Sequence, residues 1–220
     1  MPLVRLIPIE LIHNLYEARA ITLTPSYETD KEIQIKVALQ DIICLDPIVR
    51  RAVARMFNRA LRKRFPDHEE DQKRLHPEIK RVMEYRYGFI GTLAIGAIMG
   101  LLPCPIGTIK IGPDEKPEID FHGRLVTDYP YVLMDDLIKT GKTLSKELEF
   151  LLDHNFKIDT IIVFYDEGIG GQERIRIEYK KLSRFYFGKE QKIKIEVLMP
   201  RERIISLLKE AKIIVSRTNK

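Results

Sequence analysis

Residues 131–143 read YVLMDDLIKTGKT, and this stretch predicts the fold of the chain. Four apolar residues at its start predict a short buried strand. The T-G-K-T turn after the two acids predicts the start of a helix. A strand that leads through a tight turn into a helix is the repeating unit of a parallel sheet. Because the flanking chain alternates in the same way, we predict an α/β fold with a parallel sheet flanked by helices.

The other elements follow from apolar periodicity and from local start signals. One helix start is marked by Asp46 as N-cap, followed by Pro47. Residues 66–77 and 112–130 are polar and are predicted as loops. The predicted helices cover residues 9–20, 46–64, 92–102, 143–154, 171–187 and 200–212, and the predicted strands cover residues 32–39, 81–89, 105–111, 131–134, 160–165 and 192–198.

The loop after residue 134 combines carboxylates with a possible anion site. Asp135 and Asp136 stand at the end of the predicted strand, where they can accept hydrogen bonds from sugar hydroxyls or engage a hydrated Mg²⁺. At the helix start, backbone N–H groups and the helix dipole favour a phosphate. Gly141 lets the backbone come close to such an anion, and Thr140 and Thr143 add hydroxyl donors.

Two other interpretations compete for this loop. A P-loop of nucleoside triphosphatases needs a glycine five residues before its second glycine, and Asp136 occupies that position. The P-loop interpretation is therefore rejected. A simple turn with a helix cap would explain an isolated T-G-K-T. It does not explain why an apolar strand and a carboxylate pair precede this turn.

The segment YVLMDDLIKTGKTL resembles the signature of type I phosphoribosyltransferases, which bind phosphoribosyl pyrophosphate (PRPP). The shared pattern is four apolar residues, two acids, two apolar residues, one variable residue and T-G-[GK]-T. The resemblance implies that Asp135 and Asp136 hold the ribose hydroxyls of PRPP. It also implies that a run of five residues wraps the 5′-phosphate: Lys139, Thr140, Gly141, Lys142 and Thr143.

Further segments resemble orotate phosphoribosyltransferases. Residues 161–175, IIVFYDEGIGGQERI, are similar to the strand and Asp-x-x-x-Gly-Gly turn after the PRPP loop, which makes Asp166 and Glu167 base-side candidates. Residues 87–103 are similar to the pyrophosphate-binding segment, with Gly91 and Thr92 in its loop. Residues 121–125, FHGRL, resemble the strand that returns from the mobile catalytic loop, and residues 20–35 resemble an N-terminal hairpin that touches the base.

The resemblance implies two regions. Residues 1–45 would form an N-terminal hood on the base side, and residues 46–220 would form the core, with a mobile loop near 111–130. Residues 108–116, TIKIGPDEK, depart from the usual lid motif but keep Lys110 and Lys116 as candidates for the lysine that steadies the leaving pyrophosphate. Glu167 replaces an arginine that commonly helps to hold the orotate carboxylate, and its negative charge would repel orotate.

The leading hypothesis is therefore transfer of the 5-phosphoribosyl group of PRPP to a nucleobase. Orotate is the first candidate, giving orotidine 5′-monophosphate and pyrophosphate in pyrimidine synthesis. The catalytic candidates are Asp136, Lys110 and Lys116. The family implies Mg²⁺ bound mainly through PRPP, and a homodimer. The alternatives are a catalytically weak or inactive PRPP- or nucleotide-binding regulator, and an enzyme for another base, to which Lys142 points because hypoxanthine-type enzymes also carry it.

Composition indicates a folded protein in a reducing compartment. The 220 residues are 45% apolar and 31% charged, and the two cysteines are too few for a disulfide framework. The most apolar stretch, residues 89–102, is short for a membrane span, and no signal peptide is recognised, so we predict a cytoplasmic protein without a membrane partner. The net charge of +5 comes with a basic helix at residues 50–64, which we interpret as a solvated face and not as a nucleic-acid site.

Overall fold

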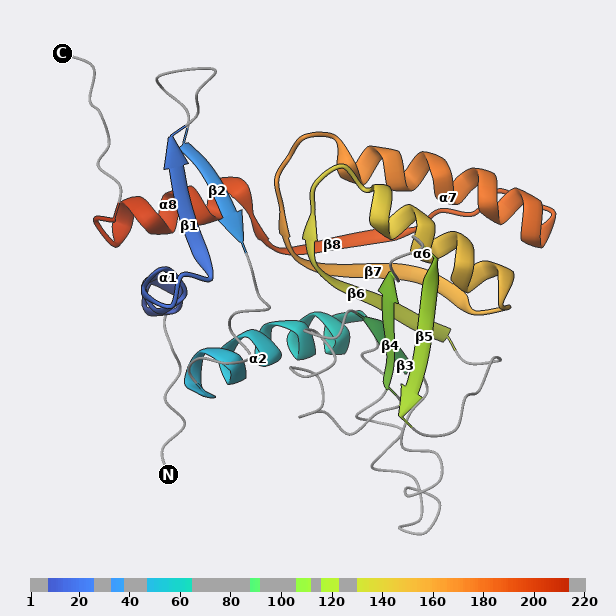
Figure 1. Cartoon of the computed structure of the whole chain (residues 1–220), viewed down its shortest axis with the longest axis horizontal. Coiled ribbons are helices and arrows are strands. Elements are labelled where there is room, and N and C mark those ends of the chain that lie inside the picture. Colours follow the sequence, from blue (N-terminus) through green and yellow to red (C-terminus); the bar gives the residue numbers. More distant parts are fainter. Residues whose placement is uncertain are drawn as a thin grey trace, which may run out of the picture.

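The computed structural model describes residues 8–25, 33–37, 47–64, 88–91, 106–111, 116–122 and 130–213. Within these ranges the chain forms one six-stranded sheet, one two-stranded sheet and helices on both faces of the larger sheet (Figure 1). The predicted α/β class is confirmed. Of the strand predicted at 81–89, residues 88 and 89 belong to β3, and residues 81–87 lie outside the described residues. The helix predicted at 92–102 and the loop predicted at 66–77 lie outside them as well.

The larger sheet is parallel except at one edge. Its spatial order is β5-β4-β3-β6-β7-β8, and only the pairing of β4 with β5 is antiparallel. Because the other strands are parallel, their carboxyl ends meet at one edge of the sheet, which is where α/β proteins bind ligands. The strands are β3 (Gly88–Gly91), β4 (Ile106–Ile111), β5 (Pro117–His122), β6 (Pro130–Ile138), β7 (Lys157–Asp166) and β8 (Lys194–Pro200).

Helices α6 (Lys142–Asp153) and α7 (Gly171–Phe187) cover one face of the sheet. Apolar residues of α6 recur at helical spacing and form a buried stripe with Leu144, Leu148 and Leu151. They pack with residues of β6 and β7 and with Ile175 and Tyr179 of α7. Figure 1 shows both helices on the same side of the central strands.

The other face carries the N-terminal elements and the last helix. These are α1 (Pro8–Glu17), the antiparallel pair β1 (Ile21–Pro25) and β2 (Ile33–Val37), α2 (Pro47–Arg64) and α8 (Arg201–Glu210). Their buried residues share one core with Val132 and Met134 of β6 and Phe164 of β7. In Figure 1 the pair β1–β2 and α1 lie beside α8, which follows directly from the carboxyl end of β8.

Several predicted bounds differ from the structure by a few residues, and two larger differences bear on the site. Strand β6 does not end at residue 134 but runs to Ile138, so the two acids belong to the strand and not to a loop. Strand β5 lies inside the polar stretch 112–130 that was predicted as loop. A strand at a sheet edge needs only one apolar face, as the register pair Ile109 and Ile119 illustrates, so its polar composition concealed it. Residues 112–115 and 123–129 lie outside the described residues, and the mobile loop there stays a prediction.

None of the helices in the described ranges is long and apolar enough to cross a membrane.

Candidate functional site

The two acids at the end of β6 differ in their exposure. Asp135 is buried, with 5% of its surface exposed, whereas Asp136 is half-buried. The Asp136 N–H donates a 2.8 Å hydrogen bond to Oδ1 of Asp135, so the first acid holds the backbone of the second. Asp136 is therefore the acid with more surface available to a ligand at the carboxyl edge of the sheet.

The turn from β6 into α6 leaves the helix start open. Gly141 has the left-handed φ of 72°, and α6 begins at the next residue without a side-chain cap. The side chains of the turn are exposed on both sides of this glycine, at Lys139 and Thr140 and at Lys142 and Thr143. Backbone N–H groups at an uncapped helix start carry partial positive charge and favour an anion. The five residues predicted to wrap a phosphate are thus brought together in one turn.

Gly141 is buried against a second turn, which the sequence did not indicate. A Cβ atom at Gly141 would lie 2.5 Å from the carbonyl oxygen of Gly171 and 2.9 Å from Cγ1 of Ile175. A Cβ atom at Gly171 would in turn meet the Lys139 carbonyl oxygen and Cγ2 of Ile138. The sequence predicted that Gly141 is needed for approach to an anion. The structure adds that two backbones touch at this point, so both positions require glycine.

The second turn, between β7 and α7, is organised by Asp166. Its Oδ1 accepts a 3.0 Å hydrogen bond from the Gly168 N–H, and its Oδ2 accepts a 2.7 Å bond from Nε2 of Gln172. Gln172 in turn accepts a bond from Nη2 of Arg176 at 2.9 Å. Because both carboxylate oxygens of Asp166 are engaged inside this turn, its observed contacts are structural.

Glu167 links the two turns. Its N–H donates to the Ile138 carbonyl at 2.9 Å, and its carboxylate lies 3.7 Å from Nζ of Lys139. Lys139 was predicted on the phosphate side and Glu167 on the base side, and in the structure they form an ion pair across the two turns. The lysine side chain is 62% exposed, so a phosphate can compete for it in water.

Glu147 is an acid of this site that sequence reasoning missed. It lies on the buried stripe of α6 between Leu144 and Leu148, with 2% of its surface exposed. Burial, and then the charge of Asp136, raise the pKa of Glu147 to about 8. Burial first, followed by the charges of Glu147 and Asp136, raises the pKa of Asp135 well above its usual range. The available signal was a glutamate at the helical spacing of three leucines.

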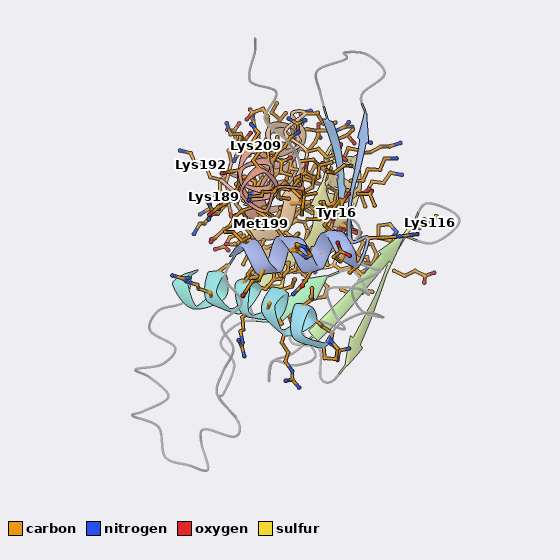
Figure 2. All side chains as sticks on the ribbon, turned by 90° about the vertical axis from the view of Figure 1, so that its left-hand side faces the viewer. Tyr16, Lys116, Lys189, Lys192, Met199 and Lys209 are labelled. Carbon is orange, nitrogen blue, oxygen red and sulfur yellow. The ribbon has the colours of Figure 1, made fainter. Side chains whose placement is uncertain are left out.

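The remaining predicted residues are placed less completely. Gly91 ends β3 and pairs in register with Met134, which brings it to the same sheet edge as the acids. Thr92 lies outside the described residues. Lys110 is opposite Glu118 in the β4–β5 register, and its side chain is not described. Lys116 is exposed at the start of β5, and Figure 2 shows it on the opposite side of the view from Lys189 and Lys192.

Magnesium was predicted to bind mainly through PRPP. Among the described residues, no group of three or more His, Cys, Asp or Glu side chains is arranged to hold a metal ion. The acids at the end of β6 offer acceptors to hydroxyl groups at the open edge of the sheet. Their negative charge also fits a cation that arrives chelated by a pyrophosphate.

Comparison with known proteins defines the fold. No protein-family model matches the chain, and no curated protein matches it. Among solved structures, the UMP synthase of Leishmania donovani superposes with a TM-score of 0.63 at 18% identity, over 95% of this chain and 40% of that protein. This chain therefore spans less than half of the UMP synthase.

Two further structures match along nearly their whole length. The orotate phosphoribosyltransferase of Aeropyrum pernix gives a TM-score of 0.52 at 15% identity, over 90% of this chain and 98% of that one. An adenine phosphoribosyltransferase gives 0.53 at 10% identity, over 86% and 99%. The chain has the type I phosphoribosyltransferase fold, as its signature segment predicted.

Proposed function

We propose that this chain binds PRPP at the turn from β6 to α6 and transfers its phosphoribosyl group to a nucleobase. One observation carries the proposal: a half-buried carboxylate, Asp136, lies at the carboxyl edge of a parallel sheet, and one short turn separates its strand from an uncapped helix start. A ribose phosphate needs both features, because its hydroxyls donate to a carboxylate while its phosphate accepts from backbone N–H groups. The phosphoribosyltransferase fold supports the same assignment.

The proposed roles follow the exposure of each group. Asp136 accepts hydrogen bonds from the ribose hydroxyls, and Asp135 supports it through the backbone bond at 2.8 Å. The first N–H groups of α6 and the hydroxyls of Thr140 and Thr143 bind the 5′-phosphate. Lys142, which is exposed at the helix start, adds positive charge. Residues 1–45 form the hood over the base in this proposal.

The reaction is a displacement at C1 of the ribose. A ring nitrogen of the base forms the new bond to C1 while the bond from C1 to pyrophosphate breaks. Pyrophosphate leaves with the electron pair of that bond, and the proton of the ring nitrogen passes to solvent. The protein contributes position and charge, because the sugar carbon becomes cationic as the bond breaks. Mg²⁺ chelated by PRPP supplies neutralisation of the leaving pyrophosphate. Gly91 and Thr92, with Lys110 or Lys116, are the proposed partners of that group.

Orotate is the first base to test, and Glu167 is a specific reason to test others. Its carboxylate lies at the carboxyl end of β7, 20% exposed, and pairs with Lys139. A negative side chain repels an anionic base such as orotate, whereas it accepts a hydrogen bond from an amino group. An enzyme for another base, or a regulator that binds PRPP without turnover, is the second candidate function.

One assay distinguishes these functions. The chain is incubated with PRPP, Mg²⁺ and a panel of bases, pyrophosphate release is measured, and PRPP binding is measured separately by calorimetry. Release with orotate supports the leading proposal, release with a different base supports the other specificity, and binding without release supports the regulator. Absence of PRPP binding contradicts the whole proposal. Sedimentation of the same sample tests the proposed homodimer.

Asp136→Asn provides the matched variant for this assay. Loss of a charged hydrogen-bond acceptor to the ribose should weaken PRPP binding by roughly 1.5–3 kcal/mol, which is about 10- to 100-fold. Asp153→Asn is the control, since Asp153 is an exposed acid at the other end of α6. Full PRPP affinity in Asp136→Asn would refute the role assigned to this acid.

A further inference from the structure

A buried glutamate occupies a position of α6 where packing favours an apolar residue. The inward face of α6 repeats at Leu144, Glu147, Leu148 and Leu151, which is the spacing of one helical stripe. Three of these four residues belong to the apolar core between α6, α7 and the sheet. Glu147 is buried among them, and its Oε2 is buried without a hydrogen-bond partner.

Asp135 faces the same layer from the sheet. Side chains alternate along a strand, so Asp135 shares a face of β6 with Tyr131 and Leu133, which pack against α6. Its Oδ1 accepts the Asp136 N–H, and the charge of Glu147 acts on it. The helix and the strand therefore each contribute a buried carboxyl group to the layer between α6 and the sheet.

The other elements packed on this region present apolar groups. Helix α7 contributes Ile175 and Tyr179, and β7 contributes Ile161 and Val163. Tyr179 is the titratable group among these four residues. Its hydroxyl donates to the Ile158 carbonyl at 2.6 Å, and burial followed by the charge of Asp159 raises its pKa to about 12, so it stays neutral. The charge that acts on Glu147 thus comes from Asp136 of β6.

A buried carboxyl without a cationic partner is stable only when it carries a proton. A protonated Glu147 adds no negative charge to the layer that already holds the strand acids. It also presents an O–H donor on the side where those acids are acceptors. A leucine at this position would pack as well but would offer no hydrogen-bond donor. Packing alone therefore does not explain why this position carries a glutamate.

We propose that Glu147 is a positioning residue of this site: from the helix side, it keeps the Asp135–Asp136 pair in place so that the Asp136 carboxylate faces the ribose hydroxyls. The inference rests on the proposed function for its ligand. Glu147 acts through the strand acids and does not contact the ligand. It lies on the buried face of α6, so this helix contributes a side chain to the support of the site.

Binding by two variants tests this role. Glu147→Leu keeps the apolar packing and removes the carboxyl group, and it should weaken PRPP binding about tenfold because α6 then offers the strand acids no O–H donor. Glu147→Gln keeps a donor without the charge, and its affinity should stay within about threefold of the wild type. Glu149→Gln, on the exposed side of the same helix, is the control and should leave affinity unchanged.

The pH profile separates positioning from simple packing. Above pH 8 the wild-type Glu147 ionises beside the strand acids, so wild-type PRPP affinity should fall, whereas Glu147→Gln should show no such fall. Wild-type affinity and an unchanged pH profile in Glu147→Leu would overturn the proposal. Circular dichroism of each variant establishes that the fold is kept.

A measurement without PRPP keeps this inference distinct from the proposed function. Carboxyl ¹³C resonances of glutamate, compared between the wild type and Glu147→Gln, should reveal one group with a midpoint near 8. Asp136→Asn should lower this midpoint, since the charge of Asp136 raises it. A midpoint near the ordinary 4.5 would refute the neutral acid. Failure of PRPP to bind, together with a midpoint near 8, would contradict the proposed function and leave the protonation of Glu147 established.

Discussion

The turn after β6 and the turn after β7 share one plan. Each leaves the carboxyl end of a parallel strand, and each enters its helix through a glycine in the left-handed region, Gly141 with φ 72° and Gly170 with φ 90°. Neither helix start has a side-chain cap. Figure 1 shows the two turns next to each other at the same end of α6 and α7.

The two turns differ in how tightly they are packed. A Cβ atom at Gly141 would lie 2.5 Å from a backbone oxygen, whereas a Cβ atom at Gly168 or Gly170 would meet nothing within 4 Å. Ile169 of the second turn is 59% exposed. Close packing therefore restricts the backbone of the first turn to one conformation, which suits a fixed phosphate contact. Substitutions at the exposed residues of the second turn, such as Ile169, should leave the first turn in place.

The acids of the two turns also differ. Both carboxylate oxygens of Asp166 accept hydrogen bonds inside its own turn. Asp136 is instead half-buried, and the pKa values of the two carboxyl groups that it influences, Asp135 and Glu147, are raised. One acid thus shapes a loop and the other is available to a ligand. Asp166 is thus a structural aspartate and Asp136 is the aspartate proposed to bind the ribose, although both lie at the carboxyl ends of strands of the same sheet.

The largest effect should come from Gly171→Ala. The added methyl would press on the Lys139 carbonyl and on Ile138 across the two turns, so the variant should lose about 3 kcal/mol of unfolding free energy. PRPP affinity should fall as well, because the first turn is displaced. Urea denaturation and calorimetry check both effects. Wild-type stability in this variant would refute the claim that the two backbones lock each other.

Gly170→Ala is the control for that experiment. This position has a left-handed φ and open space, so the cost should be limited to about 1 kcal/mol of backbone strain. If Gly170→Ala lost as much unfolding free energy as Gly171→Ala, the cost of both variants would come from backbone conformation and not from contact between the turns.

Glu147→Gln should change stability in a pH-dependent way. In the folded protein the pKa of Glu147 is about 8, above the ordinary 4.5, so between these values the folded state holds a proton that the unfolded state has lost. Wild-type unfolding free energy therefore falls as pH rises through this window. The variant lacks this loss, and its advantage should grow from near zero below pH 4.5 to a plateau above pH 8.

Thermal unfolding at a series of pH values measures this advantage. Glu149→Gln serves again as the exposed control. An advantage that is constant with pH would show that the gain comes from packing and not from the proton.

Asp166→Asn should affect folding more than binding. An asparagine at this position keeps one acceptor, but it loses the charge that Gln172 and Gly168 now share, so about 1–1.5 kcal/mol of unfolding free energy should be lost. PRPP affinity should change by less than about threefold. The reverse pattern is expected for Asp136→Asn, and equal effects of both variants on binding would remove the distinction between the two acids.

The smallest effect should come from the ion pair between the turns. A double-mutant cycle with Lys139→Met and Glu167→Gln should give a coupling of about 0.5 kcal/mol, because the lysine is largely exposed. The coupling should decrease with added salt. A coupling above about 2 kcal/mol would indicate that this pair, and not the glycine contact, holds the turns together.

Much of the core was predictable from local patterns. The helix at 171–187 was predicted with its observed bounds, and the N-cap and proline at 46–47 located the start of α2. These signals are local, since apolar spacing and caps act within one element. Strand β5 was missed because its polar, edge-strand composition resembles that of a loop. The end of β6 at Ile138 was missed because Asp135 and Asp136 were interpreted as loop residues. In the structure, β6 pairs with β7 as far as Ile138 and Asp166.

The sequence by itself determined the α/β class, the acid pair and the turn proposed to bind a phosphate, because these depend on neighbouring residues in one strand–turn–helix unit. Only the tertiary structure decided that Gly141 packs on Gly171, that Lys139 pairs with Glu167, and that Glu147 is buried as an acid. The first two contacts join segments about 30 residues apart, and the third depends on the layer between helix and sheet. Periodicity can place a residue on a face, but burial and contacts with distant segments set its charge and its role.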